Sequence, residues 1–106
     1  MKRIKTQHEY HDADIIGFRW NESSELLLDV LLDGSWNSGY EGPVLMRFLD
    51  VRNREMIDSE LTKLSARPNN PSLANIVGIR KLPNHHYLID ATPCSIQIDA
   101  GAMMEN

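Results

Sequence analysis

The chain has 106 residues and a formal net charge of −4, with 11 Lys and Arg against 15 Asp and Glu. We expect one domain over residues 1–106, with an N-terminal arm over 1–11 and a frayed tail over 101–106, because this length buries a core without a metal or a disulfide. The charge balance excludes a general basic footprint for nucleic acid, and the apolar runs fall short of the about 20 residues of a membrane-spanning helix. The single cysteine, Cys94, is expected to be buried and inert, and we expect a cytoplasmic protein.

Residues 13–20, ADIIGFRW, predict a strand, because branched and aromatic side chains alternate with others. One predicted face consists of Ile16, Phe18 and Trp20. The next run, 25–34, fits two structures: a strand with its even-numbered apolar residues inward, or a helix with Ser23 or Ser24 as N-cap and Gly34 as C-cap. We favour the strand, since a short connection to the preceding strand makes a hairpin.

The rest of the chain reads as short runs separated by breaks. Residues 34–43, GSWNSGYEGP, are a loop by composition. Residues 44–51 alternate as a half-buried strand, 52–67 predict a short helix or turn with a cap at Asp58 or Ser59, and 67–72, RPNNPS, form a break. Three further strands are predicted at 73–82, 86–91 and 95–100.

About six strands with at most one short helix predict a mostly β fold. We expect a single antiparallel sheet, curled as a sandwich or a partly open barrel. The sequence shows no repeat at a solenoid or propeller period.

The stretch HEYHDADIIGF, residues 8–18, gathers two histidines and three carboxylates. A zinc-binding helical motif needs histidines four residues apart, whereas His8 and His11 are three apart. His85 and His86 would point to opposite faces of a strand. We therefore expect Asp12 or Asp14 to turn the chain into the strand, with solvated histidines and neither a metal nor a cofactor.

The segment over residues 21–42 carries five carboxylates and no Lys or Arg, together with two large aromatic residues in a loop rich in Gly, Ser and Asn. Rigid aromatics beside small polar residues are typical of recognition surfaces, and uncompensated acids steer a basic partner. The predicted partner-binding residues are Glu22, Glu25, Asp29, Asp33, Trp36, Tyr40 and Glu41. The alternative is that the aromatics cover the sheet edge and the acids form a solvated face.

The order of segments HDADIIGF, an acidic leucine-rich strand, VLMRFLDV, NIVGIRKL and YLIDA…SIQIDA resembles small bacterial immunity proteins of toxin delivery systems, including those of contact-dependent growth inhibition. The resemblance covers most of residues 11–100. It implies a non-catalytic cytoplasmic protein that binds and neutralises a cognate toxin, and it carries over no catalytic residue. If the toxin is a nuclease, its cleft is basic, and the acids listed above would stand where phosphates bind.

The sequence is also compatible with other functions. One is a small metal-dependent hydrolase that uses histidines and Asp12. Another is a ligand-binding β-barrel with a pocket lined by Phe18, Trp20 and Phe48. Self-association through an exposed strand edge is compatible with each of them, and the sequence sets no oligomeric state.

Overall fold

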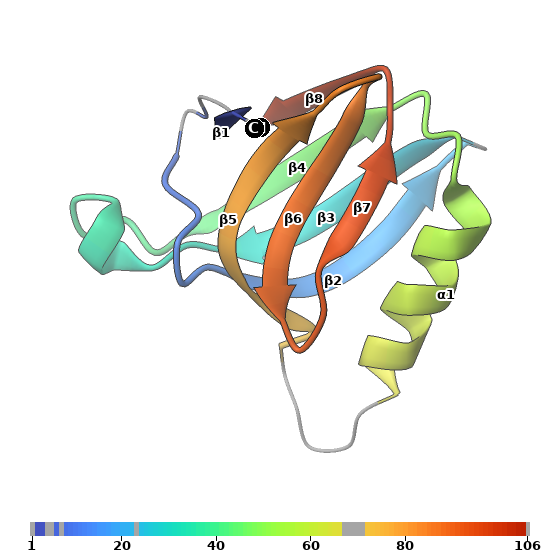
Figure 1. Ribbon diagram of the computed structural model, residues 1–106. Coiled ribbons are helices and arrows are strands. Elements are labelled where there is room, and N and C mark those ends of the chain that lie inside the picture. Colours follow the sequence, from blue (N-terminus) through green and yellow to red (C-terminus); the bar gives the residue numbers. More distant parts are fainter. Residues whose placement is uncertain (1, 4–5, 7, 23, 67–71, 106) are drawn as a thin grey trace.

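The computed structural model describes residues 2–3, 6, 8–22, 24–66 and 72–105 (Figure 1). Its strands are β1 (Lys2–Arg3), β2 (Asp14–Asn21), β3 (Glu25–Leu31), β4 (Pro43–Leu49), β5 (Ala74–Leu82), β6 (His86–Thr92), β7 (Ile96–Asp99) and β8 (Ala102–Glu105). A short 3-10 helix, η1 (Gly34–Trp36), follows β3, and one α-helix, α1 (Arg54–Ser65), follows β4. The predicted break at 67–72 lies, apart from Ser72, outside the described residues.

The fold is mostly β, as predicted, and consists of one antiparallel sheet that does not close into a barrel. Seven strands follow the order β7-β6-β5-β2-β3-β4-β8, and β1 pairs with β5 beside them. Figure 1 shows the sheet strongly curled, so that β5, β6 and β7 lie in front of β2, β3 and β4. Their inner faces meet in the core, where the rings of Phe48 on β4 and Tyr87 on β6 pack edge to face with centroids 5.7 Å apart.

Helix α1 runs along the open side of the curled sheet (Figure 1). It buries Ile57, Leu61 and Leu64, an i, i+4, i+7 stripe that packs on the core. The predicted cap was wrong, because the helix begins after Asn53, several residues before Asp58. Within the helix, Asp58 instead accepts a hydrogen bond of 3.1 Å from the indole Nε1 of Trp20.

Residues 25–31 form a strand, which resolves the ambiguity between strand and helix in favour of the prediction. The inner face of β3 buries Leu26, Leu28 and Val30 completely. The outer face carries Asp29 and the exposed Leu31. A hairpin with β2 holds this register, with Phe18 opposite Leu28 in the ladder.

Two β-bulges change the side-chain pattern of the long strands. In β2 the register shifts between Ile15 and Gly17, so Ile16 is the extra residue. It is 40% exposed, while Ile15 is fully buried and Phe18 packs against the core. The predicted face of Ile16, Phe18 and Trp20 was therefore wrong at Ile16, because an inserted residue shifts the alternation by one position. Strand β5 has the same irregularity between Ile76 and Gly78.

The two bulges belong to two equivalent three-stranded meanders, β2-β3-β4 and β5-β6-β7. The segment ADIIGFR (13–19) corresponds to ANIVGIR (74–80). In the first meander, Gly17 stands opposite Asp29 and Arg19 opposite Leu27. In the second meander, the same pairs are Gly78 with Asp90 and Arg80 with Leu88.

The meanders meet through β2 and β5, which pair antiparallel at their beginnings. Asp14 faces Asn75, its own equivalent, so a pseudo-two-fold axis passes between them. The flanking hydrogen bonds are matched as well: the N–H of Asp12 donates to the carbonyl of Ile76 at 2.8 Å, and the N–H of Leu73 donates to that of Ile15 at 2.7 Å. The repeat has too long an offset to be a solenoid or propeller period, so a search at those periods does not reveal it.

The C-terminal segment is ordered as β8, which corrects the expected frayed tail. Residues 102–105 pair with β4, with Met103 opposite Phe48, and the N–H of Gly101 donates to the carbonyl of Leu49 at 2.8 Å. These bonds to a distant strand order a segment that lacks a strong pattern of its own. Cys94 was expected to be buried, and it is only partly so, with its Sγ 3.9 Å from a carboxylate oxygen of Glu60.

Candidate functional site

The connection between β3 and β4 is the feature that distinguishes the two meanders. It spans residues 32–42, whereas the equivalent connection between β6 and β7 spans only 93–95. The 3-10 helix in the long connection buries none of its residues. Trp36 is 52% exposed and Tyr40 is 49% exposed. The sister connection shows that a meander of this kind can close with far fewer residues.

The loop holds its own shape through local hydrogen bonds. Asp33 caps the 3-10 helix, because its Oδ1 accepts from the backbone N–H of Ser35 at 2.8 Å. The N–H of Gly39 donates to the carbonyl of Gly34 at 2.8 Å, and Gly39 adopts a φ of 86° that favours glycine. The aromatic side chains therefore project from an ordered turn.

The N-terminal arm packs against this loop through Asn37. Its side chain pairs with the backbone of Glu9 in both directions, accepting from the N–H at 3.0 Å and donating to the carbonyl at 2.9 Å. The indole Nε1 of Trp36 donates to Oδ2 of Asp12 at 3.1 Å. Two segments far apart in sequence thus form one surface, which we call the η1 surface and define as residues 8–12 and 33–41.

Two histidines contact the aromatic residues of the η1 surface. The ring of His8 stacks near that of Tyr40, with centroids 6.0 Å apart, and His11 meets Trp36 edge to face at 4.8 Å. The Nδ1 of His11 lies 3.0 Å from the carbonyl oxygen of Val77. A carbonyl oxygen only accepts, so Nδ1 carries the proton of this bond. The other nitrogen, Nε2, lies 3.7 Å from Oδ2 of Asp12.

An open pocket of about 400 Å³ lies on the η1 surface, between the arm, the loop and β5. Its lining residues are Glu9, His11, Trp36 and Val77. Val77 is the bulge residue of β5 and is 49% exposed. The bulge thus turns an apolar side chain outward at the place where the aromatic loop passes.

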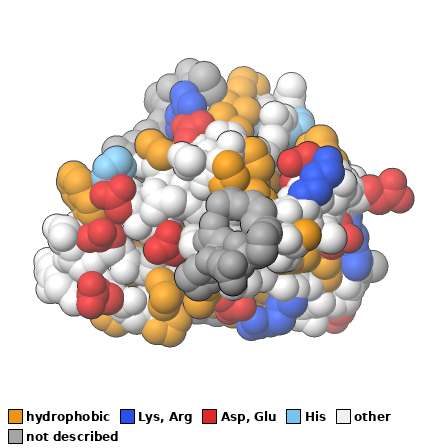
Figure 2. Space-filling model, turned by 90° about the horizontal axis from the view of Figure 1, so that it is seen from below, with side chains coloured by type: hydrophobic (Ala, Val, Ile, Leu, Met, Phe, Trp, Pro, Cys, Tyr) orange, Lys and Arg blue, Asp and Glu red, His pale blue; other side chains and the backbone are white. Residues whose placement is uncertain are grey.

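The η1 surface is acidic. Its residues include four carboxylates, Glu9, Asp12, Asp33 and Glu41, and no Lys or Arg. Figure 2 shows this side of the molecule at the left of the view, where carboxylate and hydrophobic side chains lie beside a histidine. The lysine and arginine side chains visible in that view lie elsewhere.

The predicted acidic residues do not form one group. Asp33 and Glu41 belong to the η1 surface with Trp36 and Tyr40, whereas Glu22 is exposed at the β2–β3 turn, at the other end of the hairpin. A strand advances by about 3.3 Å per residue, so β3 separates the two ends by roughly 20 Å.

Two of the predicted acids, Glu25 and Asp29, pair with arginines on neighbouring strands. Oδ2 of Asp29 lies 2.8 Å from Nη1 of Arg19, and Oε2 of Glu25 lies 2.6 Å from Nε of Arg47. The hydrogen bond from Arg47 lowers the pKa of Glu25. This pair stabilises the fold above the ordinary pKa of Glu25, and its contribution is lost as the pH falls through the lowered value. The expectation that these acids lack a counter-charge was therefore wrong for both residues.

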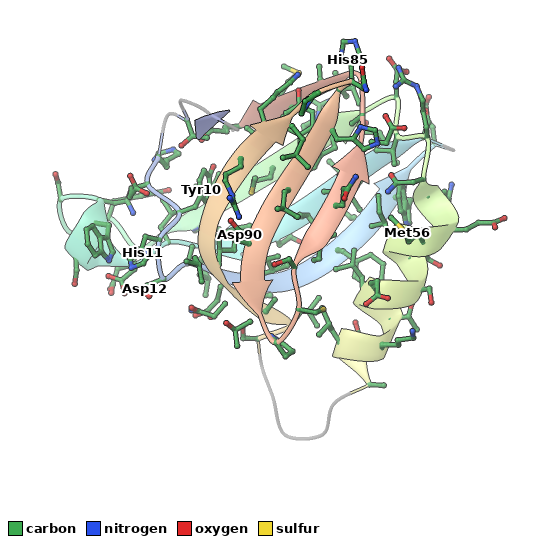
Figure 3. All side chains as sticks on the ribbon, in the orientation of Figure 1. Tyr10, His11, Asp12, Met56, His85 and Asp90 are labelled. Atoms are coloured by element: carbon green, nitrogen blue, oxygen red, sulfur yellow. The ribbon has the colours of Figure 1, made fainter. Side chains whose placement is uncertain are left out.

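The structure divides the four histidines into two pairs, His8 with His11 and His85 with His86. His11 lies at the η1 surface and His85 at the turn between β5 and β6, on distant parts of the molecule (Figure 3). His86 lies near Asp99, with 3.7 Å between Nε2 and Oδ2. Among the described residues, no group of three or more His, Cys, Asp or Glu side chains is placed to hold a metal ion.

The residues expected to line a barrel pocket fill the interior instead. Phe48 is completely buried, and Phe18 and Trp20 pack against the core. The guanidinium of Arg54 lies over the ring of Trp20 at 4.6 Å from its centroid. Trp20 therefore stabilises the contact between β2 and α1.

Sequence reasoning missed the contribution of the arm and of β5 to the site. It treated His11 and Asp12 as a solvated entry to a strand, and Asp12 does take a positive φ of 65° at that turn. The contacts with Trp36 and Val77 join residues that are distant in sequence, so no local pattern reveals them.

A comparison of the chain with protein-family models, with curated proteins and with solved structures finds no match. Within the described residues, no helix is long and apolar enough to cross a membrane. The candidate site therefore rests on its own geometry.

Proposed function

We propose that the protein is a non-catalytic, cytoplasmic immunity protein that neutralises a cognate toxin by binding it through the η1 surface. The observation that carries the proposal is the long β3–β4 connection, which the equivalent meander lacks and which exposes Trp36 and Tyr40 among carboxylates. The resemblance of residues 11–100 to immunity proteins of toxin delivery systems agrees with it.

The chemistry of the surface suits a basic partner, such as the substrate cleft of a nuclease. Exposed Trp and Tyr side chains contribute large contact areas at low entropic cost. A surface rich in carboxylates attracts a basic domain and speeds its association. A protein that covers such a cleft excludes the nucleic acid, so inhibition requires no reaction.

The test is a pull-down of the tagged protein, expressed with a candidate toxin domain from the neighbouring upstream reading frame, followed by titration calorimetry. We expect one-to-one binding that weakens as salt is raised, because exposed charges are screened. Trp36→Ala and Tyr40→Ala should each weaken binding by about 30-fold, which corresponds to about 2 kcal/mol for a central aromatic contact.

Met56→Ala is the matched control, since Met56 is similarly exposed, at 51%, but lies on α1. It should leave the affinity unchanged. A second comparison measures the affinity of Glu41→Gln, on the η1 surface, and that of Glu22→Gln, at the far end of the hairpin. Only the substitution on the η1 surface should weaken binding. The proposal is wrong if the neighbouring toxin does not bind, or if it binds equally well to the Trp36 and Tyr40 variants.

A further inference from the structure

The pocket lined by Glu9, His11, Trp36 and Val77 combines aromatic, aliphatic and acidic side chains. Trp36 supplies a half-exposed indole, Val77 supplies an exposed branched aliphatic side chain, and Glu9 supplies a carboxylate. The carboxylate of Asp12 stands at the indole nitrogen of Trp36. The pocket thus offers apolar surface and negative charge at the same place.

The hydrogen-bonding groups at this pocket are mainly acceptors. The bond between His11 and the carbonyl of Val77 places the proton on Nδ1, so in the neutral ring Nε2 is an acceptor. That nitrogen lies 3.7 Å from Oδ2 of Asp12. An anionic ligand such as phosphate would meet negative charge here, whereas a cation with several N–H groups would find partners.

An arginine side chain matches this pocket better than other basic groups. Its planar guanidinium stacks on an indole and donates to carboxylates in a fixed geometry, while its methylene stem packs on apolar surface. Lysine offers a compact, strongly hydrated ammonium with no plane to stack.

We propose that this pocket receives an arginine side chain of the partner protein, with the guanidinium beside Trp36 and Asp12 and the aliphatic stem against Val77. The inference rests on the proposed function, since it identifies the side chain of the toxin that the η1 surface recognises. It goes further by assigning one residue type to one pocket.

The test uses N-acetyl-arginine amide as a probe in a ¹H–¹⁵N NMR titration of the whole protein. Its neutral isostere, N-acetyl-citrulline amide, is the control ligand. We expect the arginine probe to shift the indole N–H of Trp36 and the amides of His11 and Val77, with millimolar affinity, and the citrulline probe to leave them in place. Equal shifts with both probes, or shifts centred on another region, overturn the inference.

The carboxylate is tested by Asp12→Asn. Asparagine accepts the positive φ of this position and keeps an oxygen for Trp36, so the substitution removes the charge alone. We expect the dissociation constant of the arginine probe to rise about 3- to 10-fold. Asp50→Asn is the matched control, because Asp50 is exposed, has a φ of 55° and follows the far end of β4. It should leave the affinity unchanged, and an equal effect of both variants contradicts the assignment.

The outcomes separate this inference from the proposed function. If the toxin binds in a Trp36-dependent manner but the arginine probe does not, the inference is wrong and the function stands. If the probe binds but the toxin does not, the pocket is a guanidinium site and the proposed function is wrong.

Discussion

Tyr10 is the residue that fixes the N-terminal arm to the rest of the molecule. Its side chain is only 2% exposed, and its hydroxyl donates to Oε2 of Glu105 on β8 at 2.6 Å. The same carboxylate accepts from the N–H of His8 at 3.3 Å. The arm thus approaches the η1 surface from a buried anchor, and the last strand of the chain contributes to positioning the proposed binding residues.

Tyr10→Phe should lower the free energy of unfolding at pH 7 by about 1 to 3 kcal/mol, because a buried hydrogen bond to a charged group is lost. Burial, and then Glu105, raises the pKa of Tyr10 above the ordinary value of about 10. Its contribution is therefore complete below pH 10 and declines as the pH rises further, since only the unfolded chain ionises there.

Urea denaturation at several pH values checks both parts of this prediction. Between pH 9 and 11 the free energy of unfolding of the native sequence should fall more steeply than that of Tyr10→Phe. The variant is the control, because it keeps the other tyrosines and lacks only Tyr10. Parallel curves for the two proteins would contradict the assigned shift.

At the scale of elements, the sequence predicted the strands that have a clean alternation. Strand β4 buries Val44, Met46 and Phe48, and β7 buries Ile96 and Ile98, as the period of two indicates. The sequence did not predict the local structure where contacts between residues distant in sequence determine it. Strand β8 is stabilised by pairing with β4, and the bulge at Ile16 inserts a residue that local alternation does not anticipate.

The sequence likewise predicted only part of the candidate site. Composition identified the loop with Trp36 and Tyr40, because Gly, Ser and Asn around aromatics indicate an exposed turn. The prediction that all nearby acids belong to the same site as the loop failed, because Glu25 and Asp29 pair with arginines of adjacent strands. Cross-strand partners depend on the register, which the sequence alone did not determine.

Replacing residues 32–42 with Asn-Gly tests whether the long connection serves binding and not the fold. Leu31 and Pro43 are opposite partners in the ladder, so a two-residue turn can join them if the variant also carries Pro43→Thr, because proline has no N–H for the closing hydrogen bond. The variant should keep its β-sheet circular dichroism but lose about 2 to 4 kcal/mol, because Leu32 is buried and is removed.

The same variant should show no binding of the toxin. Leu32→Ala alone is its control, since it reproduces most of the loss in stability and retains Trp36 and Tyr40. Binding that survives loop replacement would exclude the η1 surface as the interface.

At the scale of the whole molecule, two equivalent meanders share one core. Each contains a bulge, and each carries the same diagonal ion pair: Arg19 with Asp29 at 2.8 Å, and Arg80 with Asp90 at 2.6 Å. Each half of the molecule also adds a short strand to the meander of the other half, because β1 pairs with β5 and β8 pairs with β4. The halves are therefore joined by strand pairing in three places as well as by the chain that contains α1.

A chain divided between Asn69 and Asn70 should consequently reassemble. Co-expressed fragments 1–69 and 70–106 are expected to copurify as a one-to-one complex with the circular dichroism of the intact protein. Each fragment alone should be unfolded, because a separated meander exposes its core face to water. Failure to copurify, with both fragments present in the lysate, would contradict this view of the interface between the meanders.

The unequal connections of the two meanders have a consequence for divergence. The connection over 93–95 shows how little chain a meander needs at this position, while the connection over 32–42 carries the exposed aromatic residues. Substitutions and changes of length in the long connection, beyond its first residue, leave the buried side chains untouched. If the proposed function is taken as given, the residues that select the partner can thus change between descendants of this protein while the scaffold that both halves build stays the same.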